Sequence, residues 1–351
     1  MSRSNQKSWN YLPVTIEIEM SHQCPILCKG CAIKKDIFKA KYKLNQNEIL
    51  TVLKEAKKIG IKNYSLTGGE PFLDLTLLKN IINLSPLDLV KINTNAFIFS
   101  SPQKTKDIYR QLLETGFSLK NKHISSWLNL SVGQQTLAGV PLENAIFACR
   151  DFYNFFSEKK AGISLLVFCL DQKYSKDIIE KFINKYEQIS GHEFDRRIPI
   201  KIIPSRLNEC STALKLNQYS KKKIAIKTLI KHYLNSDLMI NCTPPDIQYQ
   251  YGIIAPRILV RADGSVYSCY GFGHVYNLGN IKKESLKKIL QKINSNIALK
   301  TVLQSGLMGL LELANKYRPR IGQERISDSY GPCDICQYLN DIILSNCGKK
   351  Q

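Results

Sequence analysis

Apolar positions in the first two-thirds of the chain follow two periods in turn, that of strands and that of helices. Asn45 and Glu48 predict a capping box where one helix begins, and apolar residues then recur on one face up to Ile59. Strands are predicted at 14–20, 63–66, 87–92, 127–132, 163–170 and 198–203, and further helices at 75–84, 141–156 and 175–186. Because strand–helix repeats pack through right-handed crossovers, this order predicts an α/β fold with a parallel sheet.

The alternation of strands and helices stops near residue 220. A basic amphipathic helix is predicted at 221–234, and two strands follow on either side of Asp263-Gly264, a dipeptide typical of tight hairpin turns. A further helix is predicted at 284–293. The sequence therefore predicts two domains, 1–219 and 220–351.

Three cysteines follow the first predicted strand in the spacing C-x3-C-x2-C: Cys24, Cys28 and Cys31. Clusters that only transfer electrons normally take four cysteine ligands. Three thiolates on one loop can hold three corners of a cubane iron–sulfur cluster and leave one iron open, as a catalytic zinc keeps an open position. A zinc knuckle is the main alternative, since thiolates also suit zinc.

A glycine turn follows the second predicted strand and consists of Gly68, Gly69, Glu70 and Pro71. Two consecutive glycines allow the backbone to approach a ligand closely. The carboxylate of Glu70 can accept hydrogen bonds from an ammonium group. Each motif thus comes at the end of a predicted strand, where parallel sheets of this kind place their chemistry.

The cysteine triad and the glycine turn together resemble the radical S-adenosylmethionine (SAM) superfamily. The resemblance implies an open, partial (β/α)6 TIM-like barrel and a 4Fe–4S cluster on the catalytic cysteines Cys24, Cys28 and Cys31. It further implies that the open iron chelates SAM, that the glycine turn contacts its amino group, and that reductive cleavage yields a 5′-deoxyadenosyl radical.

Two later strand ends resemble cofactor-binding positions of the same superfamily. Thr94-Asn95-Ala96 is similar to a common Thr-Asn-Gly, and Ser131-Val132-Gly133 is similar to a Ser-x-Asp-Gly pattern. The resemblance implies that Asn95 and Ser131 contact the cofactor. Ala96 replaces a glycine, and Gly133 stands where the family pattern has an acid.

The C-terminal part resembles the twitch and SPASM extensions of radical SAM enzymes, which form a smaller α+β domain. That resemblance implies one auxiliary 4Fe–4S cluster. The candidate ligands are Cys269, Cys333 and Cys336, with Cys242 preferred as the fourth and Cys347 as the alternative. A zinc site on the same cysteines is the other possibility, because a tetrahedron of thiolates serves either metal.

Composition and charge indicate where in the cell the protein is found and which partners it binds. The 351 residues carry a net charge of +21, no apolar run reaches the length of a membrane span, and the N-terminus lacks a secretory signal. We therefore expect a cytoplasmic protein whose cysteines serve metals rather than disulfides. The positive charge is explained by lysine-rich helix surfaces or by docking of a flavodoxin- or ferredoxin-type electron donor. Binding of nucleic acid explains it less well, because no RNA-binding module is recognisable.

Radical SAM enzymes with this kind of C-terminal domain most often resemble maturases of ribosomally synthesised peptides. The resemblance implies a precursor peptide as substrate, with cross-linking, epimerisation or oxidation as the reaction. A radical SAM dehydrogenase of an aminocyclitol or sugar is the alternative, and an RNA-modifying radical enzyme is a third.

Overall fold

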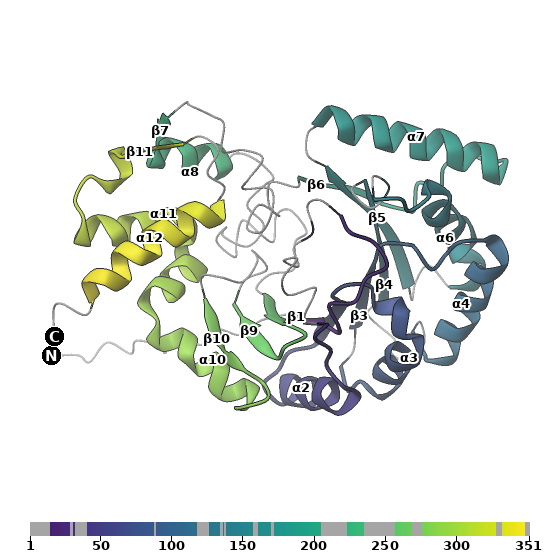
Figure 1. Cartoon of the computed structure of the whole chain (residues 1–351), viewed down its shortest axis with the longest axis horizontal. Coiled ribbons are helices and arrows are strands. Elements are labelled where there is room, and N and C mark those ends of the chain that lie inside the picture. The colour runs from purple at the N-terminus through teal and green to yellow at the C-terminus, as the bar shows by residue number, and fades with distance from the viewer. Residues whose placement is uncertain are drawn as a thin grey trace, which may run out of the picture.

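The structure is a computed structural model (Figure 1). It describes residues 15–28, 31, 41–87, 89–117, 126–133, 136, 138–156, 161–169, 172–204, 223–234, 257–268, 276–327 and 332–347. For residues 168–169, 172–175, 201–204, 232–234, 257, 327, 332–333 and 347 of these, only the backbone is described.

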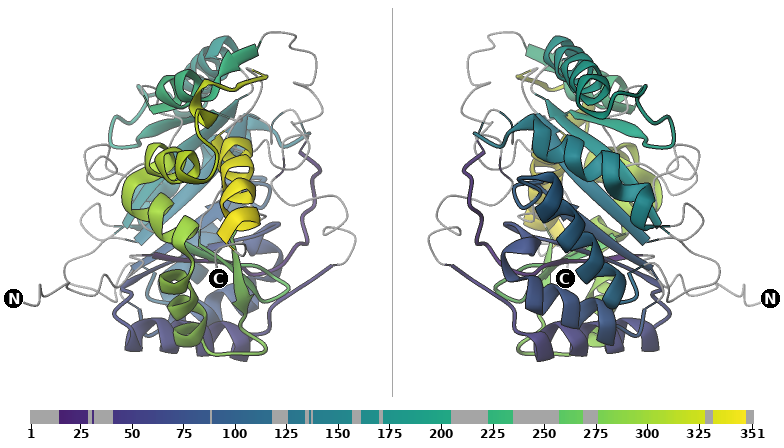
Figure 2. Two further views of the ribbon diagram at one scale, coloured as in Figure 1. Left: turned by 90° about the vertical axis from the view of Figure 1, so that its left-hand side faces the viewer. Right: turned by 90° about the vertical axis from the view of Figure 1, so that its right-hand side faces the viewer.

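Six parallel strands in chain order form the centre of the molecule. They are β1 (Thr15–Glu19), β2 (Asn63–Thr67), β3 (Leu89–Thr94), β4 (Ser126–Gly133), β5 (Ala161–Cys169) and β6 (Ile200–Pro204). The helices that follow them are α2 (Gln46–Lys58), α3 (Leu75–Leu84), α4 (Pro102–Glu114), α6 (Leu142–Phe155) and α7 (Gln172–Ser190). These helices lie together on the outer side of the curved sheet (Figures 1 and 2). The predicted α/β fold with a partial (β/α)6 barrel is confirmed.

Alternating side chains explain why the helices cover one face of the sheet. Ile16 and Ile18 of β1, and Leu66 of β2, are fully buried in the apolar core beneath the helices. The predicted capping box of α2 is present, with the Asn45 side chain accepting from the Glu48 N–H at 2.9 Å and the Glu48 carboxylate accepting from the Asn45 N–H at 2.8 Å. Helix α4 was not predicted because few of its residues are apolar, although Ser101 caps its start.

The C-terminal part continues the same sheet beyond β1. Strand β8 (Arg257–Val260) pairs with β1 in parallel, and the antiparallel strands β9 (Ser265–Tyr267) and β10 (Asn277–Asn280) complete nine strands in the order β10-β9-β8-β1-β2-β3-β4-β5-β6. The predicted hairpin is thus confirmed. Four helices gather beside this edge: α8 (Ile226–Leu234), α10 (Leu286–Ser295), α11 (Ile297–Tyr317) and α12 (Pro332–Cys347) (Figure 1).

Some predicted bounds differ from the structure. The predicted helix at 221–234 contains the short strand β7 (Lys223–Ala225), which pairs with β11 (Arg325–Ser327), and its helix begins only at Ile226. The expectation that no apolar run reaches the length of a membrane span is wrong: among the described residues, α11 is long and apolar enough to cross a membrane. This helix is interrupted at Gly306, and many of its apolar residues are buried in the core, as in a core helix of a globular protein.

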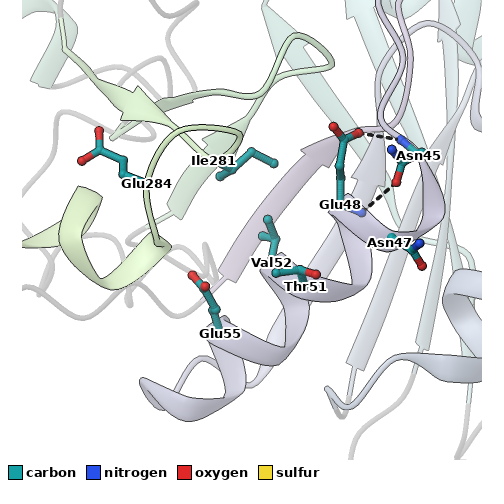
Figure 3. Close-up of a pocket in the computed structure, with 8 residues that line it drawn as sticks. All are labelled: Asn45, Asn47, Glu48, Thr51, Val52, Glu55, Ile281 and Glu284. Atoms are coloured by element: carbon teal, nitrogen blue, oxygen red, sulfur yellow. Dashed lines mark hydrogen bonds between the residues drawn. The ribbon is translucent and has the colours of Figure 1, made fainter.

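A pocket lies between α2 and the segment that leads into α10, with Ile281 and Glu284 on that side (Figure 3). Glu55 lines the pocket from α2, and its carboxylate accepts a hydrogen bond from the Leu286 N–H at 2.5 Å. Backbone N–H groups in the first turn of a helix have no partner within the helix. Glu55 of the barrel therefore adds a second cap to α10, beside its own N-cap Ser285, and ties the barrel to the C-terminal part.

Replacing Glu55 with alanine is expected to lower the free energy of unfolding by about 1–2 kcal/mol, because the Leu286 N–H loses its acceptor. Urea denaturation followed by circular dichroism measures the change. Glu114→Ala is the matched control: its carboxylate is exposed and pairs with Lys79 at 3.3 Å, so its loss should cost less than about 0.5 kcal/mol. Equal effects of the two substitutions would contradict the role of Glu55 as a cap.

Candidate functional site

The chain leaving β1 is held from two sides before the cysteine loop begins. Met20 donates its N–H to the Thr67 carbonyl at 2.9 Å and accepts from the Leu44 N–H at 2.9 Å. His22 donates its N–H to the Tyr42 carbonyl, also at 2.9 Å. The loop is therefore closed at its base by the segment that returns from it and by the end of β2.

The two glycines of the turn contact this segment of the chain itself. Gly69 donates its N–H to the Ser21 carbonyl at 2.7 Å, and Glu70 donates its N–H to the Gln23 carbonyl at 2.8 Å. A Cβ atom added at Gly68 would lie 2.4 Å from the Ser21 carbonyl oxygen, and one added at Gly69 would lie 1.8 Å from the Gln23 carbonyl oxygen. The sequence predicts close approach of these glycines to a ligand, and the structure shows their close approach to the backbone that carries the cysteines.

The Glu70 side chain joins the ends of β2 and β3. Its Oε1 accepts from the Phe72 N–H at 3.1 Å and from the Thr94 hydroxyl at 2.8 Å, and its Oε2 accepts from the Asn95 N–H at 2.8 Å. Burial raises the pKa of this carboxyl to about 7, against the three hydrogen bonds, which lower it. Three of about four acceptor positions are therefore used within the protein. Pro71 begins the short 3-10 helix that follows.

The three loop cysteines are free and partly exposed, and they lie close enough for their charges to act on one another. Burial, followed by the charges of Glu70 and Cys31, raises the pKa of the Cys24 thiol to about 12. Burial, followed by the charges of Cys31 and Cys24, does the same for Cys28. The three thiols therefore ionise only when a cation neutralises the thiolates, and metal binding releases their protons. This all-thiol donor set fits an iron–sulfur cluster.

The thiols of the described part of the chain do not surround a single ion: no group of three or more Cys, His, Asp or Glu side chains there is arranged to hold one metal. Of the predicted auxiliary ligands, Cys242 and Cys269 lie outside the described residues, and only the backbone is described for Cys333 and Cys347. Cys336 is buried, and its Sγ lies 3.9 Å from the Tyr276 hydroxyl, next to β10.

Helix α12 places the C-terminal cysteines far apart. It runs unbroken from Pro332 to Cys347, with Cys333 and Cys336 in its first turns. At 1.5 Å per residue, Cys347 lies about 16 Å along the axis from Cys336. This separation counts against Cys347 as the fourth ligand of a cluster on Cys333 and Cys336.

Sequence reasoning missed a buried pair at the exit of β1. The fully buried His22 places its Nε2 3.2 Å from the Glu19 carboxylate, and the His22 ring meets the Tyr42 ring edge-on at 5.8 Å. The Glu19–His22 contact is local, three residues apart, whereas the His22–Tyr42 contact forms only because the chain returns beside the loop.

A second missed feature is a hydrogen-bonded line of polar side chains on the concave face of the sheet, which we call the polar row. It runs from Ser164, whose hydroxyl donates to the Asn129 Oδ1 at 2.8 Å, to Asn129, whose Nδ2 donates to the Asn93 Oδ1 at 2.8 Å. Asn93 then donates to the Ser65 hydroxyl at 3.2 Å and to the Glu17 carboxylate at 3.4 Å. The polar row thus crosses β1 to β5.

Both faces of a parallel sheet are usually apolar. The polar side chains on the concave face are therefore explained better by a role in binding than by a contribution to the stability of the fold. Asn129 makes two of the four hydrogen bonds of which its amide is capable, and it is only partly buried. Ser131 follows two residues later on the same face of β4, towards the end of the strand. The face can therefore receive a polar ligand next to the cysteine loop.

Two departures from the family pattern have a backbone explanation. Ala96, where the pattern has glycine, adopts the left-handed conformation with φ 62°. Gly133, where the pattern has an acid, has φ 96°, which favours glycine over any other residue. Ala96 therefore holds a strained backbone conformation, whereas Gly133 adopts its conformation without strain.

We expect Gly133→Ala to lower the free energy of unfolding by about 1–2 kcal/mol, the cost of a left-handed non-glycine residue. The reverse exchange, Ala96→Gly, is the control. Its strain relief of about 1–2 kcal/mol is offset by the lost burial of a methyl group, about 0.8 kcal/mol, and by a more flexible unfolded chain. Urea denaturation should show little change for Ala96→Gly, and a stable Gly133→Ala protein would refute the argument.

Comparison with known proteins adds two family matches and several relatives. The radical SAM superfamily matches residues 18–128, and an iron–sulfur cluster-binding domain, SPASM, matches residues 255–306. A GTP 3′,8-cyclase of Clostridium perfringens is 31% identical over 115 residues, which are 31% of this chain and 33% of the relative, so the chain spans about a third of that protein's length. A probable GTP 3′,8-cyclase of Saccharolobus solfataricus is 24% identical over 271 residues, 72% of this chain and 82% of the relative.

Among solved structures, Streptococcus suis SuiB bound to the precursor peptide SuiA superposes with a TM-score of 0.51 at 15% identity, over 93% of this chain and 76% of SuiB. At this identity the likeness shows a shared fold. The two matched domains imply a SAM-binding 4Fe–4S cluster, SAM itself and an auxiliary iron–sulfur cluster. The chain therefore carries a radical SAM domain at residues 18–128 and a SPASM-like iron–sulfur domain in its C-terminal part.

Proposed function

We propose that this radical SAM enzyme modifies a ribosomally synthesised peptide or protein by cross-linking, epimerisation or oxidation. The polar row carries the proposal. The spare N–H and lone pair of Asn129 match the carbonyl and N–H of a peptide unit, and Glu17, Asn93 and Ser164 hold the row in place. The peptide-bound SuiB structure, which shares the fold, supports the same substrate class.

The cofactors divide between the two ends of the chain in this proposal. Cys24, Cys28 and Cys31 hold the catalytic 4Fe–4S cluster, which supplies the electron for SAM cleavage. The SAM-binding residues are Gly68, Gly69, Glu70, Pro71, Asn95 and Ser131. Cys242, Cys269, Cys333 and Cys336 hold the auxiliary cluster, and the length of α12 supports Cys242 over Cys347 as the fourth ligand.

We further propose the division into domains at residues 219 and 220, and a cytoplasmic location in which a flavodoxin- or ferredoxin-type protein donates the electron. The net charge of +21 supports an acidic donor, since opposite charges steer association. No membrane and no nucleic acid takes part in this proposal.

The test uses anaerobically purified protein, reconstituted and reduced with dithionite in the presence of SAM. We expect 5′-deoxyadenosine, together with a mass change in a candidate precursor peptide encoded beside the enzyme and co-expressed with it. A peptide that stays unmodified while 5′-deoxyadenosine forms would overturn the peptide substrate but not the radical chemistry.

A small-molecule substrate is the second candidate, and the two relatives named GTP 3′,8-cyclase favour it. The same assay separates the candidates when sugars, aminocyclitols and nucleotides replace the peptide. A nucleotide or sugar that raises 5′-deoxyadenosine formation above the rate without substrate would decide for this candidate.

A further inference from the structure

The side-chain amide of Asn95 points at a sulfur atom of the cysteine loop. Its Nδ2 donates a hydrogen bond to the Cys24 Sγ at 3.4 Å. Its Oδ1 accepts from the Phe97 N–H at 2.9 Å. Because that oxygen is committed to a backbone N–H, the orientation of the amide is fixed by its partners, and the NH2 group faces the sulfur.

The backbone of Asn95 is held as firmly as its side chain. Its N–H donates to the Glu70 Oε2 at 2.8 Å, and the neighbouring Thr94 hydroxyl donates to the Oε1 of the same carboxylate at 2.8 Å. Asn95 is 7% exposed and Glu70 is 2% exposed. The donor is thus preorganised by two strand ends, and little solvent competes for it.

We propose that Asn95 is a positioning residue that raises the reduction potential of the SAM-binding cluster through its hydrogen bond to Cys24. Hydrogen bonds to ligand sulfurs are among the features that set cluster potentials. An N–H dipole aimed at a thiolate stabilises the reduced cluster more than the oxidised one, because the reduced cluster carries one more negative charge. The inference rests on the proposed cluster site, since it takes Cys24 as a ligand.

The position of Glu70 explains why a donor is needed here. Its buried carboxylate accepts from the N–H of Asn95, the residue whose side chain meets the Cys24 sulfur, so Glu70 and the sulfur are separated by a single residue. A negative group beside a cluster opposes reduction of that cluster. Asn95 donates to both groups, its backbone N–H to Glu70 and its side-chain Nδ2 to Cys24, and the side-chain donor offsets this repulsion at the sulfur.

The test measures the midpoint potential of the SAM-binding cluster in the reconstituted protein by anaerobic redox titration with electron paramagnetic resonance. Only the signal that changes on addition of SAM is followed, so that the auxiliary cluster does not contribute. Asn95→Asp and Asn95→Ser both keep an oxygen for the Phe97 N–H and remove the N–H donor. Asn129→Asp makes the same charge change on β4, away from the sulfur, and serves as the control.

We expect a more negative potential in Asn95→Ser, with reduction at least threefold less favourable, or about 28 mV at roughly 59 mV per tenfold. Asn95→Asp should shift further because it adds a negative charge, and Asn129→Asp should shift less than Asn95→Asp. An unchanged potential in an iron-loaded Asn95→Ser protein would overturn the inference alone. A wild-type preparation without any SAM-sensitive cluster would overturn the proposed function itself.

Discussion

Cys28→Ala is expected to abolish SAM cleavage, with at least a thousandfold loss in the rate of 5′-deoxyadenosine formation, or about 4 kcal/mol in activation free energy. The substitution leaves two thiolates for three corners of the cubane. Burial and the charges of Cys31 and Cys24 already raise the pKa of this thiol, so its proton leaves only when metal replaces it. The iron and sulfide content of the purified protein should therefore fall together with the rate.

The control for this substitution is Cys149→Ala. Cys149 is buried in the apolar core, 2% exposed, on helix α6. Its replacement should leave the iron content and the rate per folded protein unchanged, because a buried free cysteine acts as a small apolar side chain. Full activity of Cys28→Ala, or equal loss of iron in both variants, would contradict the assignment of the cluster loop.

Gly69→Ala is expected to have the second largest effect, through the backbone alone. An added Cβ would lie 1.8 Å from the Gln23 carbonyl oxygen and 2.3 Å from its carbonyl carbon, distances that no side-chain rotation can relieve. The turn and the cysteine loop must therefore separate, which breaks the hydrogen bonds from Gly69 to Ser21 and from Glu70 to Gln23. We expect the loss of SAM-dependent changes in the cluster signal and at least a hundredfold slower SAM cleavage, about 3 kcal/mol.

Gly191→Ala separates steric overlap from conformational strain. Gly191 has φ 72° and no atom within 4 Å of an added Cβ, so its replacement costs strain without a clash. It should lower stability by about 1–2 kcal/mol and leave SAM cleavage intact. If Gly69→Ala behaved like Gly191→Ala, the glycine turn would not position the cysteine loop.

Local sequence patterns predict the barrel, because each strand–helix unit can be identified from a short stretch of residues. The two-residue period of Ile16 and Ile18 places both on the helix-facing side of β1. The spacing of Asn45 and Glu48 predicts the start of α2. The cysteine loop and the glycine turn could be found in the same way, since each is a contiguous motif. The position of both motifs at the carboxyl edge of the sheet follows from the strand order.

Contacts between distant segments could not be predicted from the sequence. Asn95 meets Cys24 across 71 positions, and this contact depends on the register between β1, β2 and β3. The polar row also depends on register, because Asn93, Asn129 and Ser164 are unremarkable residues until three strands are aligned. The pairing of β8 with β1 joins residues more than two hundred positions apart, and no local signal encodes it.

That pairing has a consequence for any shortened form of the protein. A chain cut after residue 219 would lose β8, and β1 would become the outermost strand, with a row of peptide groups open to water. Such an unprotected border invites strands of other molecules to add to it, so the isolated barrel should self-associate. The strand that leads into the cysteine loop is therefore shielded by the C-terminal half of the same chain.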